Sequence, residues 1–122
     1  MEVTVEPGIT IGFLNRMLVK YGMTLPVVPE LDVLTIGGLI AGGGLESTSH
    51  KWGMFHHTCT QYEVVVADGS VVLANKDHNT ELFHAIPMRC VSLSDFFTLL
   101  CMCLGVFLPS SSARSHGAVQ CS

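Results

Sequence analysis

The sequence has few charged residues. Aspartate, glutamate, lysine and arginine make up 13% of its 122 residues, against about 25% in a typical globular protein. Disordered chains are much richer in charge, so we do not expect the whole chain to be intrinsically disordered. Only 6 residues are lysine or arginine, and the formal net charge is -4. Binding to nucleic acid needs a basic surface, so we expect no nucleic-acid partner.

The sequence also lacks an apolar run long enough to cross a membrane. The longest run covers residues 96–108, whereas a spanning helix needs roughly 20 apolar residues. A run of this length is typical of a buried helix or of a signal-like core. The N-terminus has neither the basic nor the apolar stretch of a signal peptide. We therefore expect the chain as given to be neither secreted nor membrane-spanning.

Cysteine is scarce in the first 87 residues, where Cys59 stands alone, and the other four cysteines follow. The total of five is odd, and four of the five lie in a weakly patterned stretch, which does not resemble a disulfide framework. Two groups come nearest to a set of metal ligands: His56, His57 and Cys59 form one, and Cys101 with Cys103 the other. Neither has a second ligand group at the spacing of structural zinc sites, so we expect no metal.

The composition changes near Pro87. Ten of the 12 glycines lie before it, whereas seven serines lie in the last 35 residues. Residues 1–87 show strand, helix and turn patterns in regular alternation. Residues 88–122 read as an apolar run followed by a serine-rich end, which we expect to be disordered. The sequence therefore predicts one folded segment over residues 1–87 and a separate tail over residues 88–122.

The patterns within residues 1–87 predict an α+β fold. Alternating polarity indicates a strand at residues 2–6, and Thr10 is suited to cap a helix that Gly22 ends. The apolar face of this helix would comprise Ile11, Leu14, Met17, Leu18 and Tyr21. The remaining expected elements are an extended stretch at 24–29, a short helix at 35–41, a loop at 42–60, hairpin strands at 61–67 and 70–75 around Asp68-Gly69, and a short helix beginning at Asn79 or Thr80.

A glycine-rich segment is the strongest candidate for a binding site. Its glycines let a ligand approach the backbone, and successive N–H groups beside a helix N-terminus form an anion nest. The pattern favours a pyrophosphate or dinucleotide over a flexible linker, which would not need the apolar residues of the segment. Neither the Rossmann nor the Walker pattern is present. The candidate residues are Thr35, Ile36, Gly37, Gly38, Leu39, Ile40, Ala41, Gly42, Gly43, Gly44, Leu45, Glu46 and Ser47.

Several short motifs together point to a family. Thr35-x-Gly37-Gly38 is typical of flavoproteins of the vanillyl-alcohol oxidase (PCMH) type. Pro29-Glu30-Leu31-Asp32 and Glu46-Ser47-x-Ser49-His50-Lys51 are typical of one branch of them, the delta(24)-sterol reductases. Further matching motifs are Leu25-Pro26, Tyr62-Glu63-x-Val65, Ala67-Asp68-Gly69 and Leu82-Phe83-x-Ala85-Ile86-Pro87. From about Val5 to Pro87 the chain resembles the second half of the FAD-binding domain of this family.

The resemblance implies an incomplete PCMH-type domain that contributes to FAD binding through residues 35–47. The family reduces the C24–C25 double bond of sterol intermediates, with FAD as cofactor and NADPH as reductant, at the endoplasmic reticulum membrane. A sterol would therefore be the substrate of the full-length protein. The family's first FAD subdomain and its membrane anchor would lie before Met1, so we expect this chain by itself to be inactive and cytoplasmic. The resemblance assigns no catalytic residue.

Several alternatives stay open from the residues alone. The chain is either a non-catalytic truncated product, with residues after about Met88 read from an intron or an altered frame, or a small glycine-loop module for another nucleotide. Trp52 stands where the family usually has tyrosine, and it is either a core residue or a flavin contact. His50 either donates to a phosphate or lies on a solvated loop.

Overall fold

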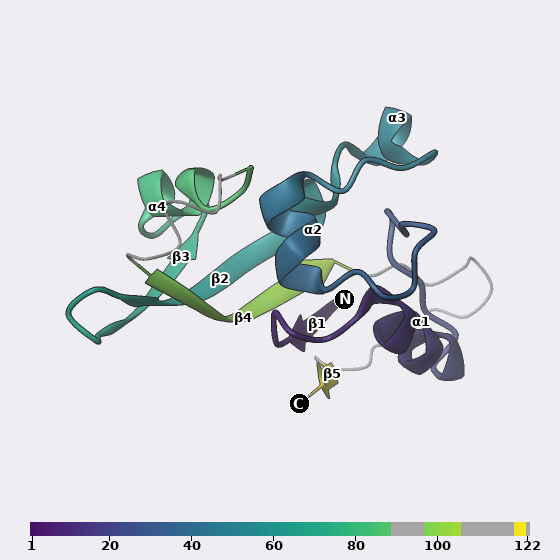
Figure 1. Cartoon of the computed structure of the whole chain (residues 1–122), viewed down its shortest axis with the longest axis horizontal. Coiled ribbons are helices and arrows are strands. Elements are labelled where there is room, and N and C mark those ends of the chain that lie inside the picture. The colour runs from purple at the N-terminus through teal and green to yellow at the C-terminus, as the bar shows by residue number, and fades with distance from the viewer. Residues whose placement is uncertain (89–96, 106–118, 122) are drawn as a thin grey trace.

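The structure is a computed structural model that describes residues 1–88, 97–105 and 119–121. Its five strands form one sheet in the order β3-β2-β4-β1-β5, in which only β1 and β5 are parallel. This mixture of helices and strands confirms the predicted α+β class. The elements, shown in Figure 1, are β1 (Glu2–Val5), α1 (Ile11–Lys20), α2 (Ile36–Gly42), α3 (Ser49–Trp52), the 3-10 helix η1 (Phe55–Thr58), β2 (Cys59–Val66), β3 (Val71–Asn75), α4 (Thr80–Ala85), β4 (Phe97–Gly105) and β5 (Val119–Cys121).

Helix α1 begins and ends where its cap residues predict. The Thr10 hydroxyl accepts a hydrogen bond from the Phe13 N–H at 3.3 Å, which satisfies one of the free donors of the first turn. Gly22 follows the helix with a φ of 68°, a conformation that glycine adopts without strain. The expectation that Tyr21 belongs to the apolar face is wrong, because the helix ends at Lys20 and Tyr21 is 58% exposed.

The hairpin of β2 and β3 is also confirmed. The chain reverses through Asp68 and Gly69, and the Val66 N–H donates to the Ser70 carbonyl oxygen at 3.0 Å. Gly69 has a φ of 83°, as a three-residue hairpin loop with a left-handed final residue requires. The Asp68 carboxylate accepts from both the N–H and the hydroxyl of Ser70, at 2.8 and 2.6 Å.

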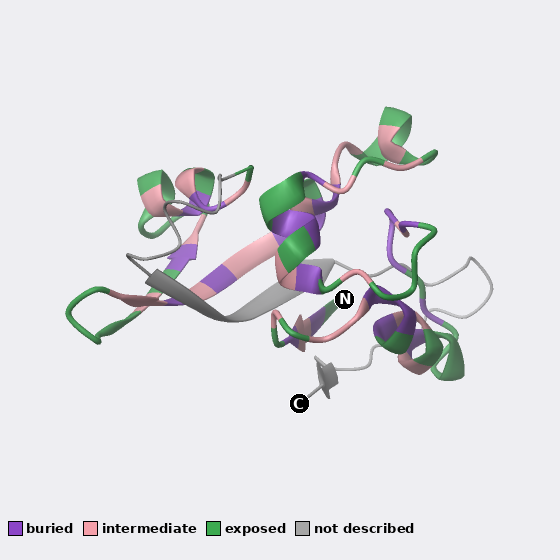
Figure 2. Ribbon diagram, viewed as in Figure 1, coloured by how far each residue is buried: buried purple, intermediate pink, exposed green. Residues whose placement is uncertain are grey.

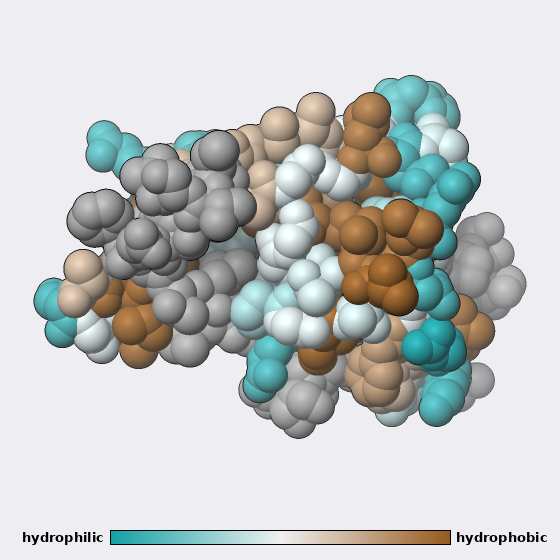
Figure 3. All heavy atoms as spheres, in the orientation of Figure 1, coloured by the Kyte–Doolittle hydropathy of each residue, from teal (hydrophilic) through white to brown (hydrophobic). Residues whose placement is uncertain are grey.

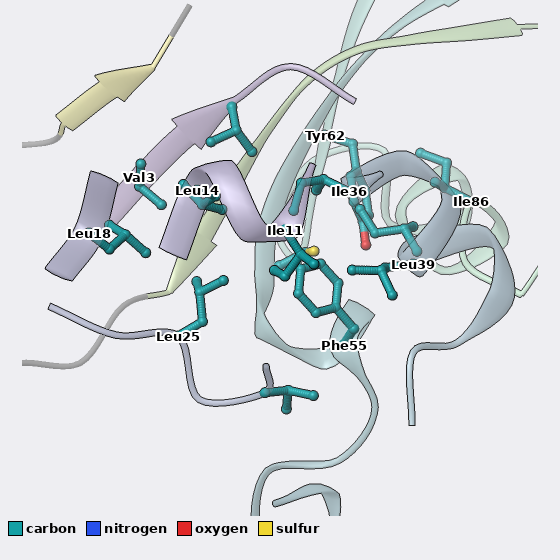
Figure 4. Packing of buried hydrophobic residues seen from close by; sticks show 14 of the residues in the cluster. Val3, Ile11, Leu14, Leu18, Leu25, Ile36, Leu39, Phe55, Tyr62 and Ile86 are labelled. Atoms are coloured by element: carbon teal, nitrogen blue, oxygen red, sulfur yellow. The ribbon is translucent and has the colours of Figure 1, made fainter. Parts of the chain in front are cut away.

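The core lies on one face of the sheet. Val5 of β1 and Tyr62 of β2 both pair with Met102 of β4, and Tyr62 also pairs with Ala74 of β3. Residues in one row across a sheet point to the same face, and Val5, Tyr62 and Ala74 are all fully buried. Side chains from α1, α2, η1 and α4 pack with them in one cluster, part of which Figure 4 shows, and Figure 2 marks the buried residues of the ribbon in purple.

The expectation of a loop over residues 42–60 is only partly correct. This stretch contains α3 and η1, and β2 begins within it at Cys59. Elements of four residues are too short to show a periodic pattern in a sequence. The position of η1 is set instead by tertiary packing, since its Phe55 side chain is fully buried in the core.

In the stretch after Pro87, the described residues form two strands. Strand β4 lies between β1 and β2, and β5 pairs with β1. The described part of the apolar run at 96–108 is therefore a strand, and not the buried helix that its length suggested. Apolar runs of this length do not distinguish strand from helix, and the partners of β4 lie far away in the sequence. The boundary at Pro87 stays a prediction, and the serine-rich stretch at 110–112 lies outside the described residues.

Among residues 1–88, 97–105 and 119–121, no helix is long and apolar enough to cross a membrane.

Candidate functional site

The N-terminal end of helix α2 is held within the protein. The Thr35 hydroxyl accepts from the Gly38 N–H at 3.2 Å, and the N–H groups of Ile36 and Gly37 donate to the carbonyl oxygens of Ile9 and Pro7, both at 2.9 Å. The first-turn donors of this helix therefore have internal acceptors. The nest that we expected from the sequence is wrong for these three N–H groups, which are not free to hold a phosphate.

Gly37 has a packing role. A Cβ at this position would lie 2.9 Å from the Cβ of Pro7 and 3.2 Å from its carbonyl oxygen. Contacts below about 3 Å are strongly repulsive for carbon atoms in a close-packed interior. The absence of a side chain at Gly37 therefore lets α2 lie directly against the loop after β1, and this glycine is half-buried there.

An open groove of about 550 Å³ runs along another face of α2. Within the helix and its cap, Thr35, Gly38, Leu39 and Gly42 line it, and their spacing of three, one and three residues puts them on one stripe of a helix. Gly38 and Gly42 are exposed, and a Cβ at Gly42 would meet no atom within 4 Å. The helix thus presents bare backbone to the groove, which suits close contact with a flat ligand.

The rim of this groove is apolar. Val33 and Leu45 line it and are 78% and 73% exposed. Leu31 nearby in the sequence is 61% exposed. Figure 3 shows near-neutral residues over α2 beside strongly apolar ones. Exposed apolar patches mark surfaces that a ligand or another part of a protein covers.

The C-terminal end of α2 is fixed by η1. The Phe55 N–H donates to the carbonyl oxygens of Gly43 and Gly44, at 3.0 and 3.2 Å. Both glycines have a positive φ, 90° and 53°, and a Cβ at Gly44 would lie 2.6 Å from the Cβ of Phe55. The Met88 N–H donates to the Ile40 carbonyl oxygen at 3.2 Å. These contacts determine where the floor of the groove ends.

The polar residues after the glycines bond mainly to one another. The Glu46 N–H donates to the Ser49 hydroxyl at 2.9 Å, and the Ser47 N–H to the Glu46 carboxylate at 2.8 Å. The Thr48 hydroxyl donates to the Pro26 carbonyl oxygen at 2.9 Å. His50 is exposed, and its Nδ1 lies 2.7 Å from the Ser47 carbonyl oxygen. The Thr48 hydroxyl thus ties the loop to the extended stretch around Pro26, and the Ser49 hydroxyl accepts a hydrogen bond within the loop.

Trp52 is not the core residue that we considered. Its side chain is 37% exposed, and the Lys51 ammonium nitrogen lies 4.9 Å from the centroid of the ring. This distance is within the range of a cation–π contact. Sequence reasoning also missed Val33 and Leu34, which line the groove although they lie outside residues 35–47. The feature of the sequence that could have identified them is that they form an apolar pair directly before the glycine-rich segment.

The histidines that we considered as metal ligands lie at a different place, on η1. The rings of His56 and His57 are 4.1 Å apart between centroids. Burial, and then the neighbouring His57, lowers the pKa of His56 below its ordinary value. In the part of the chain that the structure describes, no three histidine, cysteine or acidic side chains gather closely enough to hold a metal ion.

Comparisons with known proteins agree with the motifs. A family model described as an FAD binding domain matches residues 1–75. The chain is 54% identical over 91 residues to the delta(24)-sterol reductase of Homo sapiens, which covers 75% of this chain and 18% of that protein. It is 50% identical over 96 residues to a delta(24)-sterol reductase homolog of Caenorhabditis elegans, and this alignment covers 71% of this chain and 18% of that protein. The chain therefore spans less than a fifth of the length of these relatives.

A solved structure has the same fold. The 6-hydroxy-D-nicotine oxidase of Arthrobacter nicotinovorans superposes with a TM-score of 0.76 at 20% identity, over 88% of this chain and 23% of that one. Identity this low supports the fold alone, and the family model and the sterol reductases supply the sequence relationship. Together these findings confirm the resemblance predicted from the motifs. The chain belongs to the FAD-binding domain family.

Proposed function

We propose that this chain supplies part of the FAD site of an oxidoreductase that reduces the C24–C25 double bond of sterol intermediates. In this proposal NADPH is the reductant, a sterol is the substrate, and the whole enzyme works at the endoplasmic reticulum membrane. One observation carries the proposal: a stripe of bare helix backbone lines an open groove, in a chain that is 54% identical to a delta(24)-sterol reductase.

The groove narrows the set of residues that would hold the cofactor. Thr35, Gly38, Leu39, Gly42, Gly44 and Leu45 line it, so we assign the contact to these six of the thirteen candidates. Ile36 and Ile40 are buried in the core, and Gly37 packs on Pro7. These three residues support the position of the helix and do not contact a ligand.

The residues of the groove fit the ring of a flavin better than its phosphates. The first-turn N–H groups of α2 already have acceptors, whereas the two exposed glycines and the apolar rim offer a flat surface. FAD, when bound, supplies the hydride chemistry, and the protein binds and orients it. None of the described lining residues of the groove is titratable, so we assign this segment binding and exclusion of water, and no proton transfer.

A substitution that fills the groove tests the proposal. In Gly42→Leu the new side chain would project from α2 into open space, and leucine favours a helix more than glycine does. We expect the full chain to bind FAD, measured by quenching of flavin fluorescence. Gly42→Leu should raise the dissociation constant by about tenfold or more, equivalent to about 1.4 kcal/mol.

Ala41→Leu is the matched control. Ala41 lies on the same helix and is exposed, but it does not line the groove, so its substitution should leave FAD binding unchanged. Equal binding by wild type and Gly42→Leu would refute the assignment of the groove. Binding of NAD or ATP in preference to FAD would favour a module for another nucleotide, and absence of any flavin binding would contradict the proposal for this chain.

A further inference from the structure

A second cavity of about 440 Å³ lies between η1, β2 and α4. It shares no lining residue with the groove along α2, so nothing in the proposed FAD site uses it. Its described lining residues are His56, His57, Cys59, Tyr62, Lys76, Phe83, His84, Pro87 and Met88.

The polar part of this cavity is basic. Three histidines and Lys76 are among the residues that line it, and none of its described lining residues is acidic. Lys76 also borders a shallow groove with Glu2 and Asp77. However, the ion pair that the described residues form is Arg16 with Asp32, at 3.1 Å. The basic groups of the cavity therefore have no carboxylate of the described chain as a close counter-ion.

Two buried polar atoms belong to residues that line the cavity. The Nδ1 atom of His56 and the Tyr62 hydroxyl have no nitrogen or oxygen partner among the described residues. The Tyr62 hydroxyl lies beside the thiol of Cys59, a weak hydrogen-bonding group. Burial and this neighbour raise the pKa of Tyr62 above its ordinary value, so the hydroxyl keeps its proton. Buried polar groups without partners are rare in folded proteins and are costly.

His57 offers a donor on a defined nitrogen. Its Nδ1 accepts a hydrogen bond from the Met54 N–H at 2.9 Å, so the proton of the neutral ring is on Nε2. Because His57 is exposed, this N–H is accessible to a ligand. Protonation of the neighbouring His56 is disfavoured by burial and by His57, and a bound anion would offset both effects.

The rest of the cavity wall is aromatic and apolar. The rings of Tyr62 and Phe83 are tilted, with centroids 5.1 Å apart, and His84 meets Phe83 edge-on at 5.4 Å. Pro87 and Met88 add apolar surface. A site with several basic donors beside an apolar wall recognises an anionic group on an apolar body.

We propose that this cavity is a binding site for a small organic acid, with its carboxylate at the histidines and Lys76 and its apolar body against Tyr62 and Phe83. Elements on every side contribute titratable groups: His56 and His57 from η1, Cys59 and Tyr62 from β2, Lys76 after β3, and His84 from α4.

Benzoate is the probe for this site, and the histidine ring resonances of the full chain are the readout by NMR. Benzoate should shift the signals of His56, His57 and His84, and the shifts should saturate as benzoate is added. His50 and His78 do not line the cavity, and their signals should not move. Benzyl alcohol has the same ring without the charge, and it should bind about tenfold more weakly or worse.

Two exposed positions provide variants that leave the core intact. Lys76→Gln and His84→Gln should each weaken benzoate binding severalfold, whereas the matched control His78→Gln should not. Equal shifts at His50 and His78 would show general screening and overturn the proposal. Benzyl alcohol binding as tightly as benzoate would also overturn it, as would inorganic phosphate reproducing the shifts at the same affinity.

Discussion

Replacement of Gly44 by alanine tests the most constrained position of the candidate site. Gly44 has a φ of 53°, and an L-residue in this conformation costs roughly 1–2 kcal/mol. The added Cβ would also lie 2.6 Å from the Cβ of Phe55 and 3.3 Å from a methyl carbon of Leu39. Phe55 is fully buried and cannot move aside freely, and overpacking of this kind costs about 1–3 kcal/mol.

Together the two effects predict a loss of roughly 2–5 kcal/mol in the free energy of unfolding. Small domains are stable by about 5–15 kcal/mol, so Gly44→Ala should remove a large part of the total. Urea unfolding measures this loss, with fluorescence of Trp52, the one tryptophan of the chain, and far-UV circular dichroism as two probes.

Gly22→Ala separates the two contributions. Gly22 has a similar φ, 68°, and a Cβ there would meet no atom within 4 Å. This variant should lose only the backbone cost of about 1–2 kcal/mol. If Gly44→Ala is no less stable than Gly22→Ala, Phe55 does not constrain the end of α2, and our account of how the groove floor is fixed fails.

Three further outcomes follow from single contacts. Thr35→Ala should lower the free energy of unfolding by about 1 kcal/mol, because the Gly38 N–H loses its cap; Thr35→Ser should restore it, and equal stability of both variants would contradict the cap. Tyr62→Phe should be neutral or stabilising in the same urea assay, because the hydroxyl is buried without a nitrogen or oxygen partner; a marked loss would reveal a partner. Hydrogen bonds from Ser70 hold the pKa of the exposed Asp68 below its ordinary value. The pairing therefore stabilises the fold above the unfolded pKa of Asp68, and this contribution is lost as the pH falls through the folded pKa. Ser70→Ala should raise the Asp68 pKa in an NMR titration, and an unchanged pKa would refute Ser70 as the cause.

The elements that local signals specify were predictable from the sequence. Thr10 and Thr35 cap helices, and Asp68-Gly69 turns a hairpin, because a cap or a tight turn depends on residues only a few positions apart. Strand β4 was not predictable. It pairs with β1 and β2, which are distant in the sequence, and no local pattern shows where such partners lie.

The candidate site was likewise predictable only in part. The motifs around Thr35 and Glu46 identified the family and the glycine segment, and the family model confirms the relationship. They did not show which face of α2 is open. They also placed free donors at the start of the helix, where the structure has internal hydrogen bonds to Ile9 and Pro7.

By itself, then, the sequence determined the fold class and the family, and it pointed to the segment that we propose as a cofactor site. Only the tertiary structure gave each glycine its role. Gly37 and Gly44 are required because Pro7 and Phe55 pack against them, whereas Gly38 and Gly42 leave bare backbone in an open groove. The physical reason is that the effect of a missing side chain depends on the atoms that pack opposite it. In this fold those atoms belong to the loop after β1 and to η1.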